Sequence, residues 1–194
     1  FRKAEKFFDV VTYTGNGTST NNIAHNLGAV PAFVKVKRTD VAQEWVCSHV
    51  NLSNLQANYD LHLNDTGIAS QQGYASFQWN DTSINVKKVT DTLANANASG
   101  GTYVAYLFAS DAGGFGEDET ESIIKCGSYT GNGGSGVNSI NVGFEPQWVM
   151  VKRTDNTGSW HMLDVMRGFS VAASGGPYGG SPLYANLSNA EGSG

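Results

Sequence analysis

The chain contains an internal repeat of domain size, which limits its possible folds more than any other feature. The residues at 13–17 read Tyr-Thr-Gly-Asn-Gly, and the same five letters return at 129–133. The residues at 37–40 read Lys-Arg-Thr-Asp and return at 152–155. The offsets are 116 residues (129 − 13) and 115 residues (152 − 37), far above the roughly 20–50 residues of a solenoid repeat. The sequence therefore predicts a tandem duplication of a whole domain.

The repeat predicts a first domain at 1–112 and a second, truncated copy at 123–194. Between them, the segment 113–122 holds three glycines and a run of acidic residues, which is typical of a flexible, charged linker. The first copy ends in an apolar strand at 102–108 that has no equivalent in the second. Because an unpaired sheet edge invites pairing with other chains, we expect either that the natural protein continues or that another chain supplies this strand.

The pattern of short apolar runs predicts an all-β protein. In the segment 33–37, which reads Phe-Val-Lys-Val-Lys, valines and lysines alternate with the period of a half-buried strand. Similar runs recur every 8–15 residues and are separated by turn formers such as Gly-Asn-Gly and Asn-Asp. We expect each copy to form an antiparallel β-sandwich of the jelly-roll type. The strands are expected at 7–13, 32–37, 44–50, 59–63, 75–79, 83–89, 102–108, 123–129, 148–153, 159–165 and 183–187.

The composition excludes several classes of protein. With 12 Lys+Arg against 17 Asp+Glu, the formal net charge is −5, which disfavours binding to nucleic acid through phosphate neutralisation. No apolar run reaches the roughly 18 residues of a membrane span, so we expect no membrane insertion. The two cysteines, Cys47 and Cys126, are too few for a disulfide scaffold. Because they fall at unmatched points of the two copies, we expect free, buried thiols.

No catalytic or cofactor motif stands out in the sequence. The segment 131–136 fits Gly-x-Gly-x-x-Gly, but a dinucleotide site needs a helix directly afterwards, and 137–142 reads as a further strand. None of the four histidines lies in a metal-binding motif, and the acidic residues lie mostly in turns rather than in pairs across a cleft. We therefore expect no metal, no cofactor and no enzymatic activity.

Two groups of residues are candidates for ligand binding. Arg38 and Arg153, in the two Lys-Arg-Thr-Asp motifs, could contact a carboxylate or a phosphate. The alternative, which we favour, is a turn in which the aspartate accepts backbone N–H groups and the arginine covers an apolar edge. The second group is Trp79 with Asn80 and Asp81 at the end of an expected strand, where an exposed indole could stack on a sugar ring.

Several short motifs together resemble a known family. The chain opens with Phe-Arg-Lys-Ala and continues with Phe-Phe-Asp-Val-Val, while 97–103 reads Asn-Ala-Ser-Gly-Gly-Thr-Tyr and 143–149 reads Gly-Phe-Glu-Pro-Gln-Trp-Val. Together with the two repeated motifs, these segments resemble the repeat domain of tail-fibre and other virion structural proteins of marine tailed phages. The resemblance covers nearly all of the first copy and the second copy up to Gly168. The segment 169–194 departs from it, because the closing strand is missing.

The resemblance implies a structural protein of a bacteriophage virion, in a tail fibre or a tail-associated part, that contributes to host-surface recognition. Such a protein assembles in the host cytoplasm and becomes part of the extracellular particle. The expected partners are other virion proteins, further copies of the chain in a homotrimer, and a glycan of the host surface. The alternatives are a purely structural virion scaffold or capsid decoration protein, and a polysaccharide-degrading tail enzyme, which needs a carboxylate pair that the sequence does not offer.

Overall fold

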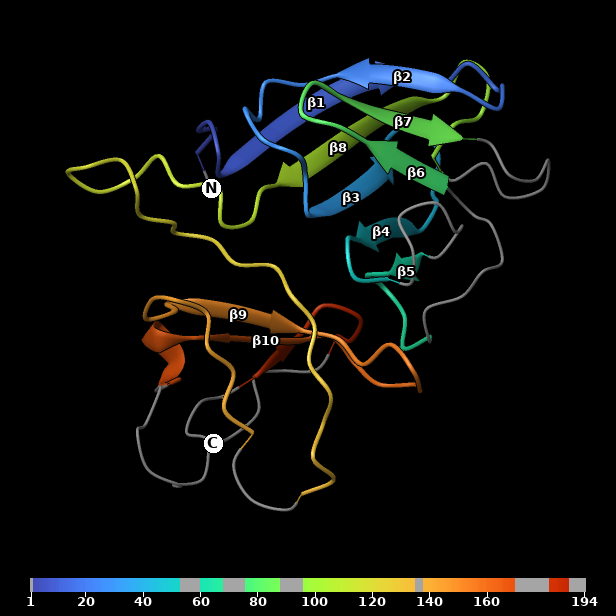
Figure 1. Cartoon of the computed structure of the whole chain (residues 1–194). Helices are drawn as coiled ribbons and strands as arrows, with labels where there is room; N and C mark the ends of the chain where they lie inside the picture. Colours follow the sequence, from blue (N-terminus) through green and yellow to red (C-terminus); the bar gives the residue numbers. More distant parts are fainter. Residues whose placement is uncertain are drawn as a thin grey trace. The chain divides into compact units, whose positions relative to one another are not determined.

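The computed structural model is all-β, as the sequence predicts (Figure 1). It describes residues 2–52, 60–67, 76–87, 96–134, 138–169 and 182–188. Within these ranges every pairing of strands is antiparallel, and one 3₁₀ turn, η1 (Val165–Arg167), is the helical content. No described helix is long and apolar enough to cross a membrane. The strands are β1 (Phe8–Thr14), β2 (Asn21–Ala24), β3 (Phe33–Arg38), β4 (Trp45–His49), β5 (Leu61–His62), β6 (Ser76–Trp79), β7 (Ser83–Lys87), β8 (Thr102–Phe108), β9 (Trp148–Val151), β10 (His161–Asp164) and β11 (Leu183–Tyr184).

The chain divides into two compact units. Unit 1 consists of residues 1–63 and 69–127, and unit 2 consists of residues 64–68 and 128–194. The segment 113–122, where the sequence predicts a linker, therefore belongs to unit 1.

This segment of unit 1 forms a hydrogen-bonded turn. The N–H of Phe115 donates to the carbonyl of Glu121 at 3.2 Å, and the N–H of Glu121 donates back to the carbonyl of Phe115 at 3.0 Å. At the tip, the carboxylate of Asp118 accepts hydrogen bonds from the N–H and the hydroxyl of Thr120. The glycines and acidic residues of this segment thus serve a local turn, which is the physical reason that its composition resembles that of a linker.

The described residues of unit 1 form two sheets, with strand orders β1-β8-β3-β4-β5 and β2-β7-β6. Strand β8 pairs with β1 on one side and with β3 on the other, along nearly its whole length. Strand β2 was not expected from the sequence. Its four residues read Asn-Asn-Ile-Ala, and Ile23 is the one side chain among them that is buried, so the apolar pattern is too short to detect.

The two sheets of unit 1 enclose a hydrophobic core and so form a β-sandwich. Val34 and Val36 from the five-stranded sheet and Ile84 and Val86 from the three-stranded sheet have no exposed surface. Complete burial of side chains of this size stabilises a fold by about 1.5–3 kcal/mol each. The alternation of valine and lysine in β3 therefore has the predicted cause, because the valines face this core.

The first Tyr-Thr-Gly-Asn-Gly motif fastens the end of β1 to the segment that precedes β8. Tyr13 stacks on Tyr103 with ring centroids 4.9 Å apart, and its hydroxyl donates to the carbonyl of Ala96 at 2.6 Å. Gly15 lies so close to Ala98 that a Cβ would stand 2.0 Å from the carbonyl oxygen. The motif thus needs an aromatic ring and a glycine at these two places for packing.

A buried asparagine holds the same segment in place. Asn97 is 1% exposed, and its Oδ1 accepts from the N–H of Asn16 at 3.0 Å and from Nδ2 of Asn21 at 2.9 Å. Its Nδ2 donates to Oδ1 of Asn16 and to the carbonyls of Thr18 and Val86. Because a buried polar group that loses its partner is costly, this amide links the loop after β1 to β7 and to the approach to β8.

Unit 2 contains one described sheet, with strand order β11-β10-β9 and the register found in unit 1. Val151 in β9 opposes His161 in β10, as Val36 in β3 opposes Val46 in β4. Both members of the pair lie 115 positions further along the chain (151 − 36 and 161 − 46). This agreement is consistent with the tandem duplication, which stays a prediction.

Two strands that the sequence predicts in the second copy are absent from the described residues. Residues 123–129 and 138–142 contain no strand, so both expectations are wrong. Ile123 and Tyr129 are 46% and 53% exposed. Apolar alternation predicts a strand only where a neighbouring strand and an apolar surface are present to pair with it, and the described part of the chain places neither beside these side chains.

Gly15→Ala is expected to destabilise unit 1, whereas Gly131→Ala, at the equivalent place of the repeat, is expected to be tolerated. The methyl group at position 15 would meet backbone atoms, and overpacking of this kind costs about 1–3 kcal/mol. A Cβ at Gly131 meets nothing within 4 Å. Urea unfolding measures both variants. Equal stability of Gly15→Ala and the unchanged protein would contradict the close approach.

Candidate functional site

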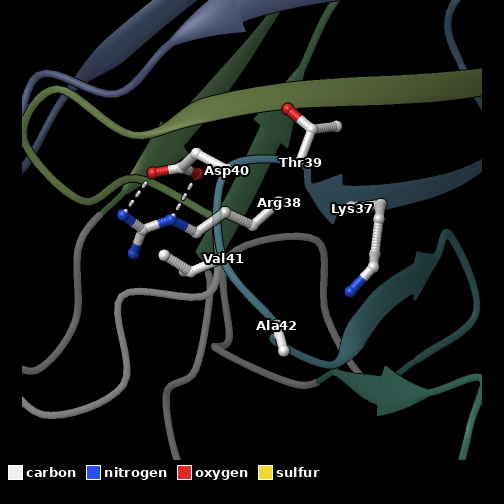
Figure 2. A pocket seen from close by; sticks show the side chains of 6 residues that line it. All are labelled: Lys37, Arg38, Thr39, Asp40, Val41 and Ala42. Carbon is white, nitrogen blue, oxygen red and sulfur yellow. Dashed lines mark hydrogen bonds and ion pairs between the residues drawn. The ribbon is translucent and has the colours of Figure 1, made fainter.

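The first Lys-Arg-Thr-Asp motif forms an open pocket at the end of β3, lined by residues 37–42 (Figure 2). Arg38 and Asp40 face each other across this turn. The guanidinium donates to the carboxylate through Nε at 2.8 Å and through Nη2 at 2.9 Å. Such a two-point pair fixes the plane of the guanidinium, so the arginine is already oriented without any ligand.

The electrostatics of this pair favour an internal role for Arg38. The hydrogen bond from Arg38 holds the pKa of Asp40 well below its usual range, and the same contact raises the pKa of Arg38. Both groups are therefore charged over the whole physiological pH range. A phosphate or carboxylate ligand would have to displace Asp40 before it could bind Arg38, which disfavours an anion site here.

The turn clamps the first residue of β8. The N–H of Thr39 donates to the carbonyl of Thr102 at 2.8 Å, and the two threonine hydroxyls are 2.7 Å apart. The N–H of Thr102 donates to Oδ1 of Asp40 at 3.3 Å. The guanidinium of Arg38 lies 5.8 Å from the centroid of the next ring, that of Tyr103. The motif therefore contacts the backbone and the hydroxyl of Thr102 and the ring of Tyr103, at the start of β8.

The second Lys-Arg-Thr-Asp motif has the same internal geometry in unit 2. Nε of Arg153 donates to Oδ1 of Asp155 at 2.7 Å, and Nη2 donates to Oδ2 at 3.4 Å. The pair is more exposed than its counterpart, with 57% of the arginine and 77% of the aspartate side chain accessible, against 16% and 34% for Arg38 and Asp40. Lys152 anchors the turn through hydrogen bonds from Nζ to backbone carbonyls.

The structure places Trp79, Asn80 and Asp81 at the tip of the β6–β7 hairpin. The indole of Trp79 is partly buried and packs against the core of unit 1. Oδ1 of Asn80 accepts hydrogen bonds from the N–H groups of Thr82 and Ser83, so the amide builds the turn. Asp81 is exposed at the tip. The three residues that the sequence groups as a candidate glycan contact therefore have different places at this tip. Trp79 packs against the core, Asn80 builds the turn and Asp81 is exposed.

A lysine contact on the outer face of the five-stranded sheet was missed at the sequence level. Nζ of Lys35 lies 4.9 Å from the ring centroid of Tyr106, 5.6 Å from that of Trp45 and 5.9 Å from that of Phe108. Burial lowers the pKa of this lysine. Alternation correctly places Lys35 opposite the core, but the register that brings these rings beside it depends on strands distant in the sequence.

The buried carboxylate of Asp9 is satisfied by hydrogen bonds and serves the fold. Its side chain is 4% exposed, and Oδ1 lies 2.7 Å from Nζ of Lys3. The N–H groups of Val10 and Asn26 each donate to it at 2.8 Å. Burial alone would raise the pKa of Asp9, but the hydrogen bonds from Lys3, Asn26 and Val10 outweigh it and lower the pKa. A carboxylate held charged in this way is a poor general acid.

Both cysteines are free, as expected. Cys47 is completely buried, and desolvation raises its pKa to about 12. Cys126 is only partly buried, which corrects the expectation of two buried thiols, and burial raises its pKa to about 11. Cys126 follows the β-sandwich in unit 1, where its N–H donates to the hydroxyl of Ser110. Neither thiol has the lowered pKa of a nucleophile.

The comparison with known families matches almost the whole chain. A family model described as "Domain of unknown function (DUF7483)" matches residues 3–193. The chain belongs to the DUF7483 family. Neither a curated protein nor a solved structure matches this chain. Because the match runs through both units, the DUF7483 assignment applies to each of them. The description of the family names no ligand and no reaction.

In this DUF7483 chain, Thr39→Val is expected to lower the free energy of unfolding by about 0.5–1.5 kcal/mol, because the contacts of the Thr39 hydroxyl with the carbonyl and the hydroxyl of Thr102 in β8 are lost. Thr154→Val, the matched change in unit 2, is expected to leave stability unchanged. Both threonines are exposed, but among the described residues only the Thr39 hydroxyl contacts a neighbouring strand. Urea unfolding of both variants gives the difference. A larger loss for Thr154→Val would contradict the role of the first motif as a clamp on β8.

Asp9 is expected to make stability depend on pH in the acid range. Its pKa is lower in the folded than in the unfolded protein, so its contribution is complete above the unfolded value of about 4 and is lost as the pH falls through the folded value. Asp9→Asn should lower the free energy of unfolding by about 1–3 kcal/mol at pH 7. The free energy of unfolding of the variant should then fall less steeply as the pH is lowered. Chemical unfolding between pH 7 and pH 2 checks this. An unchanged slope in the variant would be the contrary result.

Proposed function

We propose that this chain is a structural component of a tailed-phage virion, in a tail fibre or tail-associated part, and that it contributes to recognition of the host surface. The motifs that resemble virion structural proteins support the location. The observation that carries the structural role is the use of both repeated motifs in unit 1. The first motif contacts Ala96 before β8 and Tyr103 within it, and the second contacts Thr102, the first residue of β8.

The hairpin tip at residues 79–82 supports the contribution to surface recognition. Asn80 fixes the turn through hydrogen bonds to the two residues after Asp81, so the tip is ordered before any ligand arrives. A preorganised loop loses less conformational entropy on binding. With 18 Asn, 18 Ser and 14 Thr, the chain also offers many uncharged hydrogen-bonding groups that suit sugar hydroxyls. Repetition of the module in a fibre would add avidity to a weak single contact.

A binding assay with a simultaneous test for turnover separates the candidate functions. The purified chain is applied to a glycan array and to marine bacterial cells, and released sugar is measured in the same wells. We expect saturable binding without sugar release, and we expect Asp81→Ala to weaken it severalfold. Glu117→Ala removes another exposed carboxylate of unit 1 and serves as the matched control. Sugar release would point instead to a polysaccharide-degrading enzyme.

A purely structural role, as scaffold or decoration protein, is the second candidate. The observation that favours it is that Arg38 and Arg153 are each paired with an aspartate and that Trp79 packs against the core. A folded chain that binds no glycan and no cell, yet is found in purified particles by mass spectrometry, would support this role over host recognition.

A further inference from the structure

We propose that the outer face of the five-stranded sheet in unit 1 binds an acidic sugar residue, whose carboxylate pairs with Lys35 while its ring lies against Trp45 and Tyr106. The inference rests on the proposed function, because it names the class of glycan that the host surface would have to present. It adds a second contact, in the middle of a sheet, to the hairpin tip at residues 79–82.

The strand register places Lys35 and the two rings on one face of the sheet. In β3 the flanking valines face the core, so Lys35 between them faces the opposite side. Tyr106 in β8 lies directly opposite Lys35. Trp45 in β4 lies opposite Lys37, two positions along β3, and therefore points to the same side. Lys35, Trp45 and Tyr106 are each half-buried, so each keeps some accessible surface.

The ammonium group of Lys35 contacts aromatic rings instead of oxygen atoms. Nζ lies 4.9 Å from the ring centroid of Tyr106 and 5.6 Å from that of Trp45. Within the described ranges, no carboxylate and no carbonyl oxygen accepts a hydrogen bond from this group. A ring face attracts the charge of an ammonium group but carries no anion to neutralise it. The N–H donors of Lys35 are therefore available to an acceptor from outside the chain.

Other described lysines have an oxygen partner within the chain. Lys3 pairs with Asp9, and Lys125 pairs with Asp111. Nζ of Lys152 donates to backbone carbonyls. The surroundings of Lys35 thus differ from those of a lysine that serves only the fold.

Burial makes the charge of Lys35 unfavourable in the free protein. Desolvation lowers the pKa of this lysine, because apolar surroundings disfavour the charged form. A carboxylate placed beside the ammonium group would favour the charged form again. Since the local dielectric constant is low beside three aromatic rings, such a charge-assisted hydrogen bond would be stronger here than at an exposed lysine.

The rings beside Lys35 form a rigid apolar surface. Trp45 and Tyr106 have ring centroids 5.9 Å apart, and Phe8 stacks on Tyr106 at 6.3 Å. Tryptophan and tyrosine combine an apolar body with a polar tip, which suits the C–H face and the hydroxyls of a sugar ring. Because β3 and β8 each have a partner strand on both sides, these side chains stand on a fixed backbone, as a preorganised site requires.

The same geometry disfavours other anionic ligands. A peptide cannot add as a strand to β3 or β8, because both edges of each strand are already paired. A nucleic acid needs several cations along its phosphates, whereas the chain has a net charge of −5 and Lys37 already donates to the carbonyl of Gln43. One carboxylate on a ring with an apolar C–H face matches one ammonium group beside aromatic rings. A uronic or sialic acid residue has this chemistry.

The test measures binding of matched pairs of sugars to the purified whole chain by titration calorimetry. The acidic probes are a galacturonic acid oligosaccharide and sialyllactose, and their neutral counterparts are the methyl-esterified oligosaccharide and lactose. We expect saturable binding of at least one acidic probe. Its neutral counterpart should bind about tenfold more weakly, the effect of losing one hydrogen bond between charged groups.

Three variants locate the carboxylate contact. Lys35→Met keeps the length of the side chain and removes its charge, so it should weaken binding of the acidic probe about tenfold. Lys35→Arg keeps the charge and should retain part of the binding. Lys125→Met makes the same change of charge elsewhere in unit 1 and should bind as the unchanged chain does. Circular dichroism and thermal unfolding check that all three variants are folded.

The results separate this inference from the proposed function. Equal binding of an acidic probe and its neutral counterpart, equal binding by Lys35→Met and the unchanged chain, or no binding of either acidic probe would each overturn the acidic-sugar site. If the chain in that case still bound other glycans or cells, and Asp81→Ala weakened that binding, the role in host recognition would stand without it. If the chain bound no glycan and no cell at all, both proposals would fall.

Discussion

The fold of unit 1 depends on β8, a strand with a partner on each side. It joins β1 to the β3-β4-β5 group, so without it the five-stranded sheet would separate into two parts. The chain secures this strand before and at its start, through Asn97 in the approach and through Thr39 and Asp40 at its first residue. Much of the polar detail in unit 1 exists to hold one apolar strand in register.

The all-β fold and most strands could be predicted from the sequence, because apolar alternation and turn residues are local properties. The same locality explains the failures. Strand β2 carries a single buried residue, Ile23, and so shows no pattern. Residues 123–129 show the pattern but have no neighbouring strand in the described residues. The glycine-rich segment 113–122 has the composition of a linker and the hydrogen bonds of a turn.

The candidate site divides in the same way. The sequence favoured a turn for the Lys-Arg-Thr-Asp motif, and the Arg38–Asp40 pair agrees with this interpretation. What the turn binds could not be predicted, because Thr102 lies 62 residues beyond Asp40. The aromatic rings around Lys35 were missed for the same reason, since Tyr106 comes from a distant strand. Contacts that depend on long-range register are invisible to a local reading of residue types.

The order of strands in the five-stranded sheet has a consequence for synthesis on the ribosome. Phe8 in β1 pairs with Phe108 in β8, 100 residues later in the chain (108 − 8). The edges of β1 and β3 that pair with β8 therefore stay uncovered until β8 has left the ribosome, and the five-stranded sheet is completed only then. Such non-local pairing slows folding and exposes strand edges for longer. Thr39 and Asp40 can form their hydrogen bonds with Thr102 as soon as β8 emerges. This shortens the time available for the edge of β3 to pair with another nascent chain.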